Sequence, residues 1–239
     1  MGKRALCFLT YSNLSQPKLW HKIFNDNKEK LNVYIHNKNE FNDNEFGMHN
    51  YCIRNTKSTH YAHISLIKAT LQLFKEAFEN DENEFFILLS ESCIPLYNFQ
   101  YIYDKIFAIN SNIFSSENNN SVERFEYLTD PSFFDRSNFS KQSACLILKR
   151  NTLKFFLDND YTYLFSDTFY APDEHYFINL CNKFGILYDK RHLNYANWSS
   201  GGARPNTYYH LTNEMISDII TENPSCFFMR KIHKDCVLP

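Results

Sequence analysis

The sequence contains very little glycine and no glycine-rich nucleotide-binding motif. Only 5 of its 239 residues are Gly, and two of these adjoin at Gly201 and Gly202. Neither G-x-G-x-x-G nor G-x-x-x-x-G-K-[ST] occurs, although these motifs supply the backbone N–H groups that hold phosphates in many nucleotide-binding folds. The chain is therefore predicted to be neither an ordinary dinucleotide-binding protein nor a P-loop protein.

Long apolar runs and an excess of one charge are also missing. The apolar run at residues 5–9 is too short for a signal peptide with its cleavage site, and no window approaches a membrane span. A net charge of −2 gives no reason to expect nucleic acid or an anionic membrane as a partner. The seven Cys form no C-x-x-C pair and lie mainly in apolar runs, as buried thiols in a reducing compartment do. We therefore expect a soluble, cytoplasmic protein with no transmembrane segment.

Segments of strand character alternate with segments of helical periodicity over the first hundred residues. This alternation predicts an α/β fold with a Rossmann-type, mostly parallel sheet flanked by helices. Strands are expected at residues 4–10, 31–36, 51–53 and 85–89, and helices at 14–24, 58–78 and 97–107.

The carboxyl ends of the expected strands carry polar side chains. Tyr11 and Ser12 follow the first strand, His36 and Asn37 end the second, and Glu91 lies in the turn after residues 85–89. Parallel sheets bind their ligands at this edge. These residues are therefore predicted to surround a ligand.

The second part of the chain is less regular. Residues 110–142 are polar and rich in Asn and Ser, which is typical of a mobile connection that lies over a site. After it we expect strands at 143–148, 192–198 and 226–229, and helices ending near residue 157, beginning at Pro172 and spanning 215–220.

The segment around Pro172 has the features of a buried helix with acidic residues at its start. Pro172 suits a first helical turn, because its missing N–H would have no partner there. Asp173 and Glu174 follow in the same turn, where the helix dipole favours negative charge. A carboxylate held in this way can act as a general base toward a hydroxyl group. The alternative is that the two acids only complement the dipole.

Three further patterns suggest chemistry but have simpler interpretations. Residues 158–160 spell D-x-D, a motif of metal-dependent sugar transfer, but they follow a helix-like run, so we interpret them as a surface turn. His60 and His63 lack a third ligand at metal-binding spacing and are expected to pack or cap a helix. Ser90 and Ser92 lack the G-x-S-x-G elbow of a hydrolase nucleophile. No metal site is predicted.

Six segments, in this order, resemble the core-2/I-branching enzyme family of glycosyltransferases (β-1,6-N-acetylglucosaminyltransferase-like), in its plant and microbial branch. Leu-Leu-Ser-Glu-Ser-Cys-Ile-Pro-Leu and Asp-Glu-His-Tyr are the most specific, and the resemblance runs from Lys3 to Lys231. The segments are VYIH at 33–36, THYAHISL at 59–66, FILLSESCIPL at 86–96, PDEHY at 172–176, NWSSGG at 197–202 and FMRK at 228–231.

The resemblance implies a GT-A-like fold and an inverting transfer that needs no divalent metal or other cofactor. The donor would be a UDP-sugar, with N-acetylglucosamine the first sugar to consider, and the acceptor a glycan hydroxyl. Glu174 matches the catalytic base of the family, and Lys231 matches the lysine that neutralises the donor diphosphate. An arginine assists that lysine in the animal enzymes, and here Arg204 and Arg230 are the alternatives.

The remaining site assignments combine this resemblance with the position of residues at the carboxyl ends of the expected strands. Trp198 is expected to stack on a sugar, since flat apolar rings suit the C–H faces of sugars, and Glu91 and Asp173 are expected to contact donor or acceptor sugars. The residues at the strand ends, Tyr11, Ser12, His36 and Asn37, would bind the nucleotide. The partners implied are a nucleotide-sugar donor and a glycan or glycosylated acceptor.

We expect one domain over residues 1–239, with a nucleotide-binding half at 1–110 and an acceptor and catalytic half at 111–239. Within the polar connection, Arg124, Arg136 and Lys141 are interpreted as solvated charges, although the family places acceptor contacts in this region. The alternative function is a non-catalytic nucleotide-sugar or glycan-binding module of the same fold. Such a module has no need of a general base.

Overall fold

The computed structural model describes residues 2–40, 45–117, 122–202 and 204–239. Its main sheet has six strands among these residues, in the order β2-β1-β3-β6-β5-β7. The pairs β2–β1, β1–β3 and β5–β7 are parallel, whereas β6 runs antiparallel to both of its neighbours. The bounds are β1 (Lys3–Thr10), β2 (Leu31–Asn37), β3 (Asn83–Ser90), β5 (Asn112–Glu117), β6 (Lys141–Lys149) and β7 (Tyr188–Lys190). The predicted α/β fold class with a mostly parallel sheet flanked by helices is confirmed.

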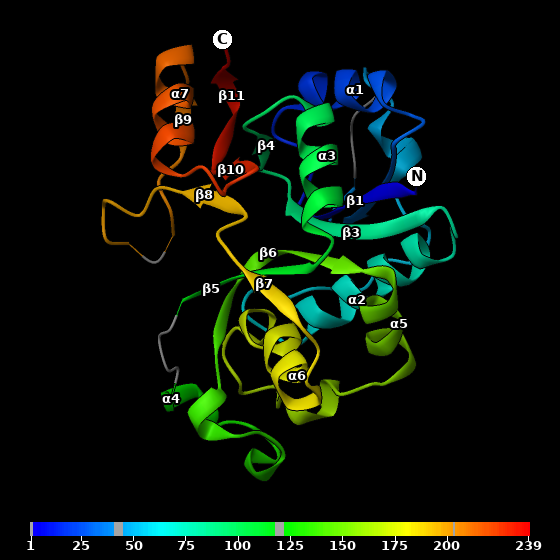
Figure 1. Ribbon diagram of the computed structural model, residues 1–239, viewed down its shortest axis with the longest axis vertical. Helices are drawn as coiled ribbons and strands as arrows, with labels where there is room; N and C mark the ends of the chain where they lie inside the picture. The colour runs from blue at the N-terminus through cyan, green and yellow to red at the C-terminus, as the bar shows by residue number, and fades with distance from the viewer. Residues whose placement is uncertain (1, 41–44, 118–121, 203) are drawn as a thin grey trace.

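Helices cover both faces of this sheet (Figure 1). Because successive strand residues point to opposite faces, Ala5 and Cys7 of β1 join one core cluster and Leu6 and Phe8 join the other. The first cluster is completed by α2, α5 and α6, and the second by α1 and α3. Their bounds are α1 (Pro17–Asp26), α2 (Ser65–Phe78), α3 (Phe99–Ile109), α5 (Arg150–Asp158) and α6 (Tyr176–Phe184).

The C-terminal segment forms two small sheets with a core of its own (Figure 1). In one of them β10 pairs with two strands. It runs antiparallel to β4, the short strand that comes directly after the turn following β3, and it runs parallel to β8. The backbone N–H of Ile232 donates to the carbonyl of Ser92 at 3.0 Å, which fastens the chain end to that turn. The bounds are β4 (Ile94–Pro95), β8 (Asn194–Ala196), β9 (Tyr208–His210), α7 (Asn213–Glu222), β10 (Phe228–Arg230) and β11 (Ile232–Val237).

Most of the predicted elements are present, but four expectations are wrong, and the fourth is the helix start at Pro172. The strand expected at 51–53 is a 3-10 turn, η1 (Met48–Tyr51), followed by a single bridge between Ile35 and Cys52. The helix expected from Ser58 begins only at Ser65, because Ala62 has a left-handed backbone (φ 54°) that no α-helix accepts. The predicted connection at 110–142 contains β5 and the short α4 (Val122–Phe125), while residues 118–121 lie outside the described residues.

The segment at Pro172 differs from a simple helix start. Residues Pro172–Glu174 form a 3-10 turn, η5, and α6 begins two residues after it ends, because His175 has a non-helical backbone (φ −132°). Asp173 and Glu174 therefore precede the α-helix instead of lying in its first turn. The other 3-10 turns are η2 (Pro131–Phe133), η3 (Arg136–Asn138) and η4 (Thr162–Leu164).

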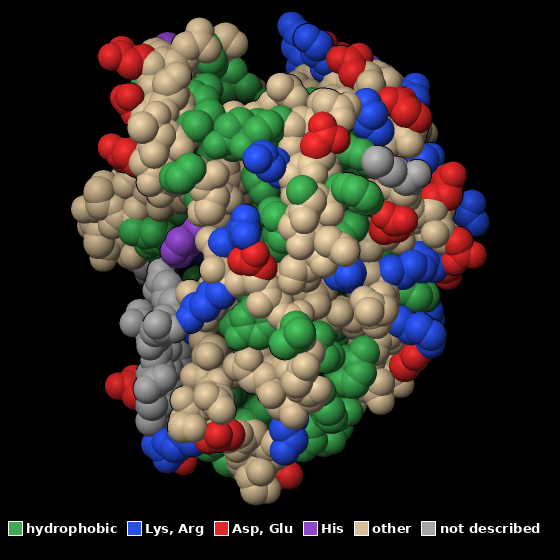
Figure 2. All heavy atoms as spheres, in the orientation of Figure 1, with side chains coloured by type: hydrophobic (Ala, Val, Ile, Leu, Met, Phe, Trp, Pro, Cys, Tyr) green, Lys and Arg blue, Asp and Glu red, His purple; other side chains and the backbone are tan. Residues whose placement is uncertain are grey.

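None of the described helices has the length and apolar character needed to cross a bilayer. On the face drawn in Figure 2, basic and acidic side chains are interspersed, so the described residues of that face build no continuous basic surface.

Candidate active site

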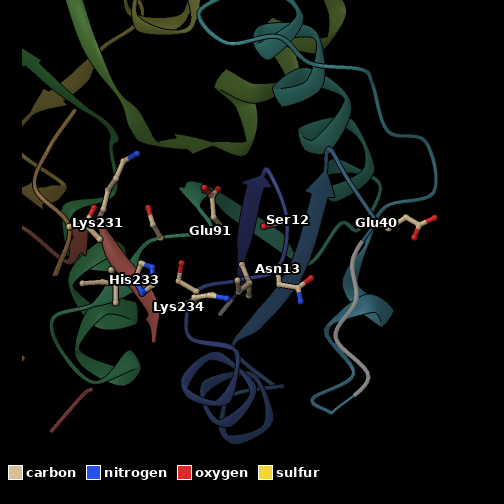
Figure 3. A pocket seen from close by; sticks show the side chains of 12 residues that line it. Ser12, Asn13, Glu40, Glu91, Lys231, His233 and Lys234 are labelled. Carbon is tan, nitrogen blue, oxygen red and sulfur yellow. The ribbon is translucent and has the colours of Figure 1, made fainter. Parts of the chain in front are cut away.

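A cavity of about 530 Å³ opens beside the carboxyl end of β1, against the C-terminal strands. Its lining includes Ser12 after β1, Glu91 in the turn after β3, and Lys231, His233 and Lys234 around the start of β11. In Figure 3, Glu91 lies between Lys231 on one side and Ser12 on the other. The fold thus brings a basic segment from the end of the chain to the ligand-binding edge of the parallel strands.

The two basic residues at the end of β10 have different surroundings. Lys231 lines the cavity, and burial together with the charge of Arg230 lowers its pKa. The Arg230 side chain lies deeper, where burial alone would lower its pKa, but the neighbouring Cys145, Cys93 and Glu91 outweigh burial and the pKa is raised. Lys231 is therefore a cation that an anion in the cavity meets, together with Lys234 of the same lining, and Arg230 lies behind it.

Two buried thiols, Cys93 and Cys145, lie near Arg230. The sequence pattern predicts both to be buried core cysteines. Cys93 and Cys145 both lie against the Asn194 side-chain amide, with nitrogen–sulfur distances of 3.5 and 3.1 Å. A hydrogen bond from Cys145 lowers the pKa of Cys93, and the same pairing raises the pKa of Cys145. The pair places partial negative charge beside the buried guanidinium.

The predicted nucleotide-binding residues are placed unevenly around the cavity. Ser12 lines it, whereas Tyr11 is 61% exposed with Lys38 Nζ 5.5 Å from its ring centroid. His36 is fully buried, its Nε2 accepts the backbone N–H of Lys57 at 2.8 Å, and burial lowers its pKa. Asn37 donates to the carbonyl of Asn39. The structure brings Ser12 to the cavity and buries His36 outside the cavity lining, and the nucleotide contacts of this group stay predictions.

Glu174 is held between two cations that sequence reasoning interpreted as solvated. Arg124 Nη1 of α4 lies 2.8 Å from Glu174 Oε2, and Lys141 Nζ of β6 lies 3.4 Å from the same oxygen. The Glu174 side chain is 29% exposed. Because both cations lie closest to Oε2, this carboxylate is fixed in orientation, with Oε1 on the other side of the group.

His175 contacts the arginine of the Arg124–Glu174 pair. Its Nδ1 lies 2.9 Å from the carbonyl oxygen of Ser140, and its Nε2 lies 3.1 Å from Arg124 Nη1. Burial lowers the pKa of His175 to about 4, so the ring is neutral near pH 7. A neutral ring satisfies both contacts when Nδ1–H donates to Ser140 and Nε2 accepts from Arg124. The histidine thereby fixes the guanidinium that holds Glu174.

Asp173 has the opposite electrostatic character. Burial and the charge of Glu174 raise the pKa of Asp173 to about 6. Its Oδ1 is buried without a hydrogen-bond partner among the described residues. The positive charges of Arg124 and Arg230 both act on this carboxyl, so Asp173 lies within electrostatic reach of both the Arg124–Glu174 pair and the basic C-terminal segment. Whether it contacts a sugar stays a prediction.

Trp198 and Arg204 lie on the loop between β8 and β9. Trp198 is 53% exposed, as a ring that stacks on a ligand must be. The Arg204 guanidinium lies 5.5 Å from the centroid of the Tyr61 ring, and its charge contributes to lowering the pKa of Lys231. Arg204 therefore stands within electrostatic reach of the cavity, outside its lining.

Side chains of the D-x-D segment and of the histidine pair form hydrogen bonds and ion pairs with other protein side chains. Asp158 forms an ion pair with Lys154 at 2.5 Å, and Asp160 accepts a bond from the Thr162 hydroxyl at 2.6 Å. His63 bonds the Ser65 hydroxyl at the start of α2. Within the described part of the chain, no group of three or more His, Cys, Asp or Glu side chains is arranged to hold a metal ion.

The chain is similar to known proteins over most of its length. The family model described as Core-2/I-Branching enzyme matches residues 5–220. A curated relative from Oryza sativa subsp. japonica, "Glycosyltransferase BC10", is 24% identical over 165 residues. That match covers 66% of this chain and 41% of the rice protein, so the similarity spans less than half of the relative's length.

Solved structures with a similar fold include sugar-transferring enzymes. The bifunctional glycosyltransferase WbbM in its apo form matches with a TM-score of 0.46 at 10% identity, over 96% of this chain and 45% of that one. Mouse xyloside xylosyltransferase 1, also apo, has a TM-score of 0.41 at 10% identity, over 100% of both chains. The galactosyltransferase LgtC with donor and acceptor sugar analogs has a TM-score of 0.39 at 10% identity, over 98% of this chain and 84% of that one.

Proposed function

The chain belongs to the core-2/I-branching enzyme family, and from this premise we propose that it is a metal-independent, inverting glycosyltransferase. It moves a sugar, N-acetylglucosamine being the first candidate, from a UDP-sugar to a glycan hydroxyl. The observations that carry the proposal are a Glu174 carboxylate fixed by two cations and a cavity whose wall contains Lys231. These are the two parts that such a reaction requires.

Glu174 supplies the base. In an inverting transfer the acceptor hydroxyl attacks the anomeric carbon from the face opposite the leaving nucleotide, and it loses its proton as the new bond forms. Arg124 and Lys141 lie closest to Oε2, so Oε1 is the oxygen that takes this proton. The ion pairs hold the carboxylate in one orientation, which reduces the entropy lost on reaching the reactive geometry.

The C-terminal basic residues support departure of UDP. As the bond between the anomeric carbon and the phosphate oxygen breaks, negative charge develops on the diphosphate. Fixed cations aimed at that charge lower the barrier without reorganising. Lys231 takes this role from the cavity wall, and Arg230 adds positive charge from behind it. Arg204, within electrostatic reach of Lys231, is the alternative second cation.

One observation favours the alternative of a non-catalytic nucleotide-sugar or glycan-binding module. The ion pairs of Glu174 with Arg124 and Lys141 would also suit a carboxylate that only fastens α4 and β6 to η5. The two functions differ in one measurable product, because only the transferase releases UDP from the donor.

The test combines donor binding with UDP release. The purified protein is melted in excess chelator with each of a panel of UDP-sugars and with UDP, since a ligand that binds the folded state raises the melting temperature. The same mixtures are assayed for UDP release with and without glycan acceptors. Binding and release in chelator support the transferase, and binding without release supports the module. Binding that requires added manganese contradicts the metal-independent mechanism.

A further inference from the structure

Two exposed tyrosines, Tyr61 and Tyr170, lie edge to face next to the catalytic base. The rings of Tyr61 and Tyr170 lie 6.5 Å apart at 72°, and the two side chains are 68% and 54% exposed. Tyr170 is linked to the base through Arg124, whose guanidinium carbon lies 5.2 Å from the Tyr170 ring while its Nη1 contacts Glu174. We call Tyr61 and Tyr170 the tyrosine pair.

The backbone holds the tyrosine pair in place through two strained turns. The residue after each tyrosine, Ala62 and Ala171, has a left-handed backbone with φ 54° and 53°. Such a conformation is unfavourable for residues other than glycine. The N–H of Ala171 donates to the carbonyl of Ala62 at 2.8 Å, so each turn holds the other. Strain of this kind persists where the surrounding structure fixes it, commonly at functional sites.

Cations lie over both rings of the pair. Arg124 covers Tyr170, and the Arg204 guanidinium lies 5.5 Å from the Tyr61 ring centroid. Lys141 is a further cation beside Arg124, and both pair with Glu174. The surface beside the base thus combines two aromatic rings with the guanidinium groups of Arg124 and Arg204.

We propose that the tyrosine pair with Arg204 and Arg124 is the acceptor subsite, and that it selects a saccharide carrying an acidic group, a carboxylate or a phosphate. The rings stack on the C–H face of a sugar, and the guanidinium groups bind the acidic group in the planar, two-point geometry that they favour. The proposal rests on the function proposed above, because it assigns the acceptor of the same reaction. The acidic group would also compete with Glu174 for Arg124.

The test measures acceptor binding directly, by isothermal titration with and without saturating UDP. The probes are trigalacturonic acid and the neutral trisaccharide maltotriose, with glucose 6-phosphate against glucose to distinguish phosphate from carboxylate. The wild-type protein is expected to bind at least one acidic probe about tenfold more tightly than its neutral counterpart, and to lose this preference in high salt.

Substitutions then separate stacking from charge. Tyr61→Ala and Tyr170→Ala are each expected to weaken binding of the acidic trisaccharide by about tenfold. Arg204→Gln is expected to abolish the acidic preference while leaving maltotriose binding unchanged. The matched controls are Tyr163→Ala, an equally exposed tyrosine on η4, and Arg54→Gln, an exposed arginine before α2, and both should bind as the wild type does.

Two results would overturn the proposal. One is equal affinity of the wild-type protein for acidic and neutral probes, and the other is an acidic preference that survives Arg204→Gln. Failure of the underlying function is read separately, as absence of any UDP-induced thermal shift. Because the titrations are also run without UDP, the acceptor result is obtained in either case.

Discussion

Lys231 and Glu174 carry opposite charges, and they differ in whether the fold gives them an ion-pair partner. Lys231 lines a cavity and forms no ion pair with the carboxylates of the described residues, whereas Glu174 is bound by two cations. A cation without a fixed partner keeps its full attraction for an incoming anion such as a diphosphate. A carboxylate held on one oxygen is oriented in advance for proton transfer. Lys231 therefore has no carboxylate partner among the described residues, whereas Glu174 is already paired with Arg124 and Lys141.

Replacing Glu174 is expected to give the largest effect. Glu174→Gln removes the base but keeps the shape of the side chain, so transfer should fall about 10³-fold while the UDP-induced thermal shift stays as in the wild type. Turnover with the UDP-sugar and acceptor is measured by UDP release. Glu123→Gln, an exposed acid of α4 next to Arg124, is the matched control, and near-normal turnover in Glu174→Gln would remove Glu174 from the mechanism.

Removing the unpaired cation should affect both donor binding and rate. Lys231→Ala is expected to lower turnover about 10²-fold, because leaving-group charge is no longer neutralised, and to reduce the thermal shift produced by UDP. This contrasts with Glu174→Gln, which spares UDP binding. Lys18→Ala, an exposed lysine of α1, controls for loss of a positive charge. An unchanged UDP shift in Lys231→Ala would contradict the assignment of Lys231.

The two neighbours of Glu174 are expected to respond to acid in opposite directions. The pKa of His175 is lowered to about 4. Between about pH 6.5 and 4 the unfolded chain therefore takes up a proton that the folded protein does not, and the free energy of unfolding decreases as the pH is lowered. This effect amounts to at most about 3 kcal/mol. The pKa of Asp173 is raised to about 6, so the folded protein is protonated first and stability rises as pH falls from about 6 to 4.

Single substitutions separate these two contributions. Asp173→Asn is expected to make the acid-induced loss of stability steeper, and His175→Gln to make it shallower. Urea unfolding at several values between pH 4 and 7 gives the free energies. Parallel pH profiles for the two variants would show that the neighbours of Glu174 do not carry these opposed shifts.

The smallest effect is expected from relieving backbone strain beside the base. Ala171→Gly replaces a left-handed alanine with a residue that tolerates φ > 0 and should raise the free energy of unfolding by up to about 1 kcal/mol. Ala108→Gly in α3, where the backbone is helical, should lower it by a similar amount. Both values come from urea unfolding. A loss of stability in Ala171→Gly would show that the turn is not strained.

Local patterns were sufficient to predict four of the six described strands of the main sheet. Buried apolar runs identify β1, β2, β3 and β6 because a strand covered on both faces has to be apolar throughout. The short elements were missed or misplaced: β5 lies within a polar segment, and η1 is a turn where a strand was expected. Their conformation depends on neighbouring strands and side chains, which a reading of adjacent residues does not contain.

By itself the sequence determined the α/β sheet, the order of its family-like segments and the prominence of Glu174 and Lys231, because periodicity and motif spacing are local properties of the chain. Only the tertiary structure decided that Arg124 and Lys141 hold Glu174, that His36 is buried, and that Tyr61 meets Tyr170. Each of these depends on segments far apart in the sequence: about 50 residues separate Arg124 from Glu174, and more than 100 separate the two tyrosines. The physical reason is that charge pairing and burial are set by distances in space, which the fold creates.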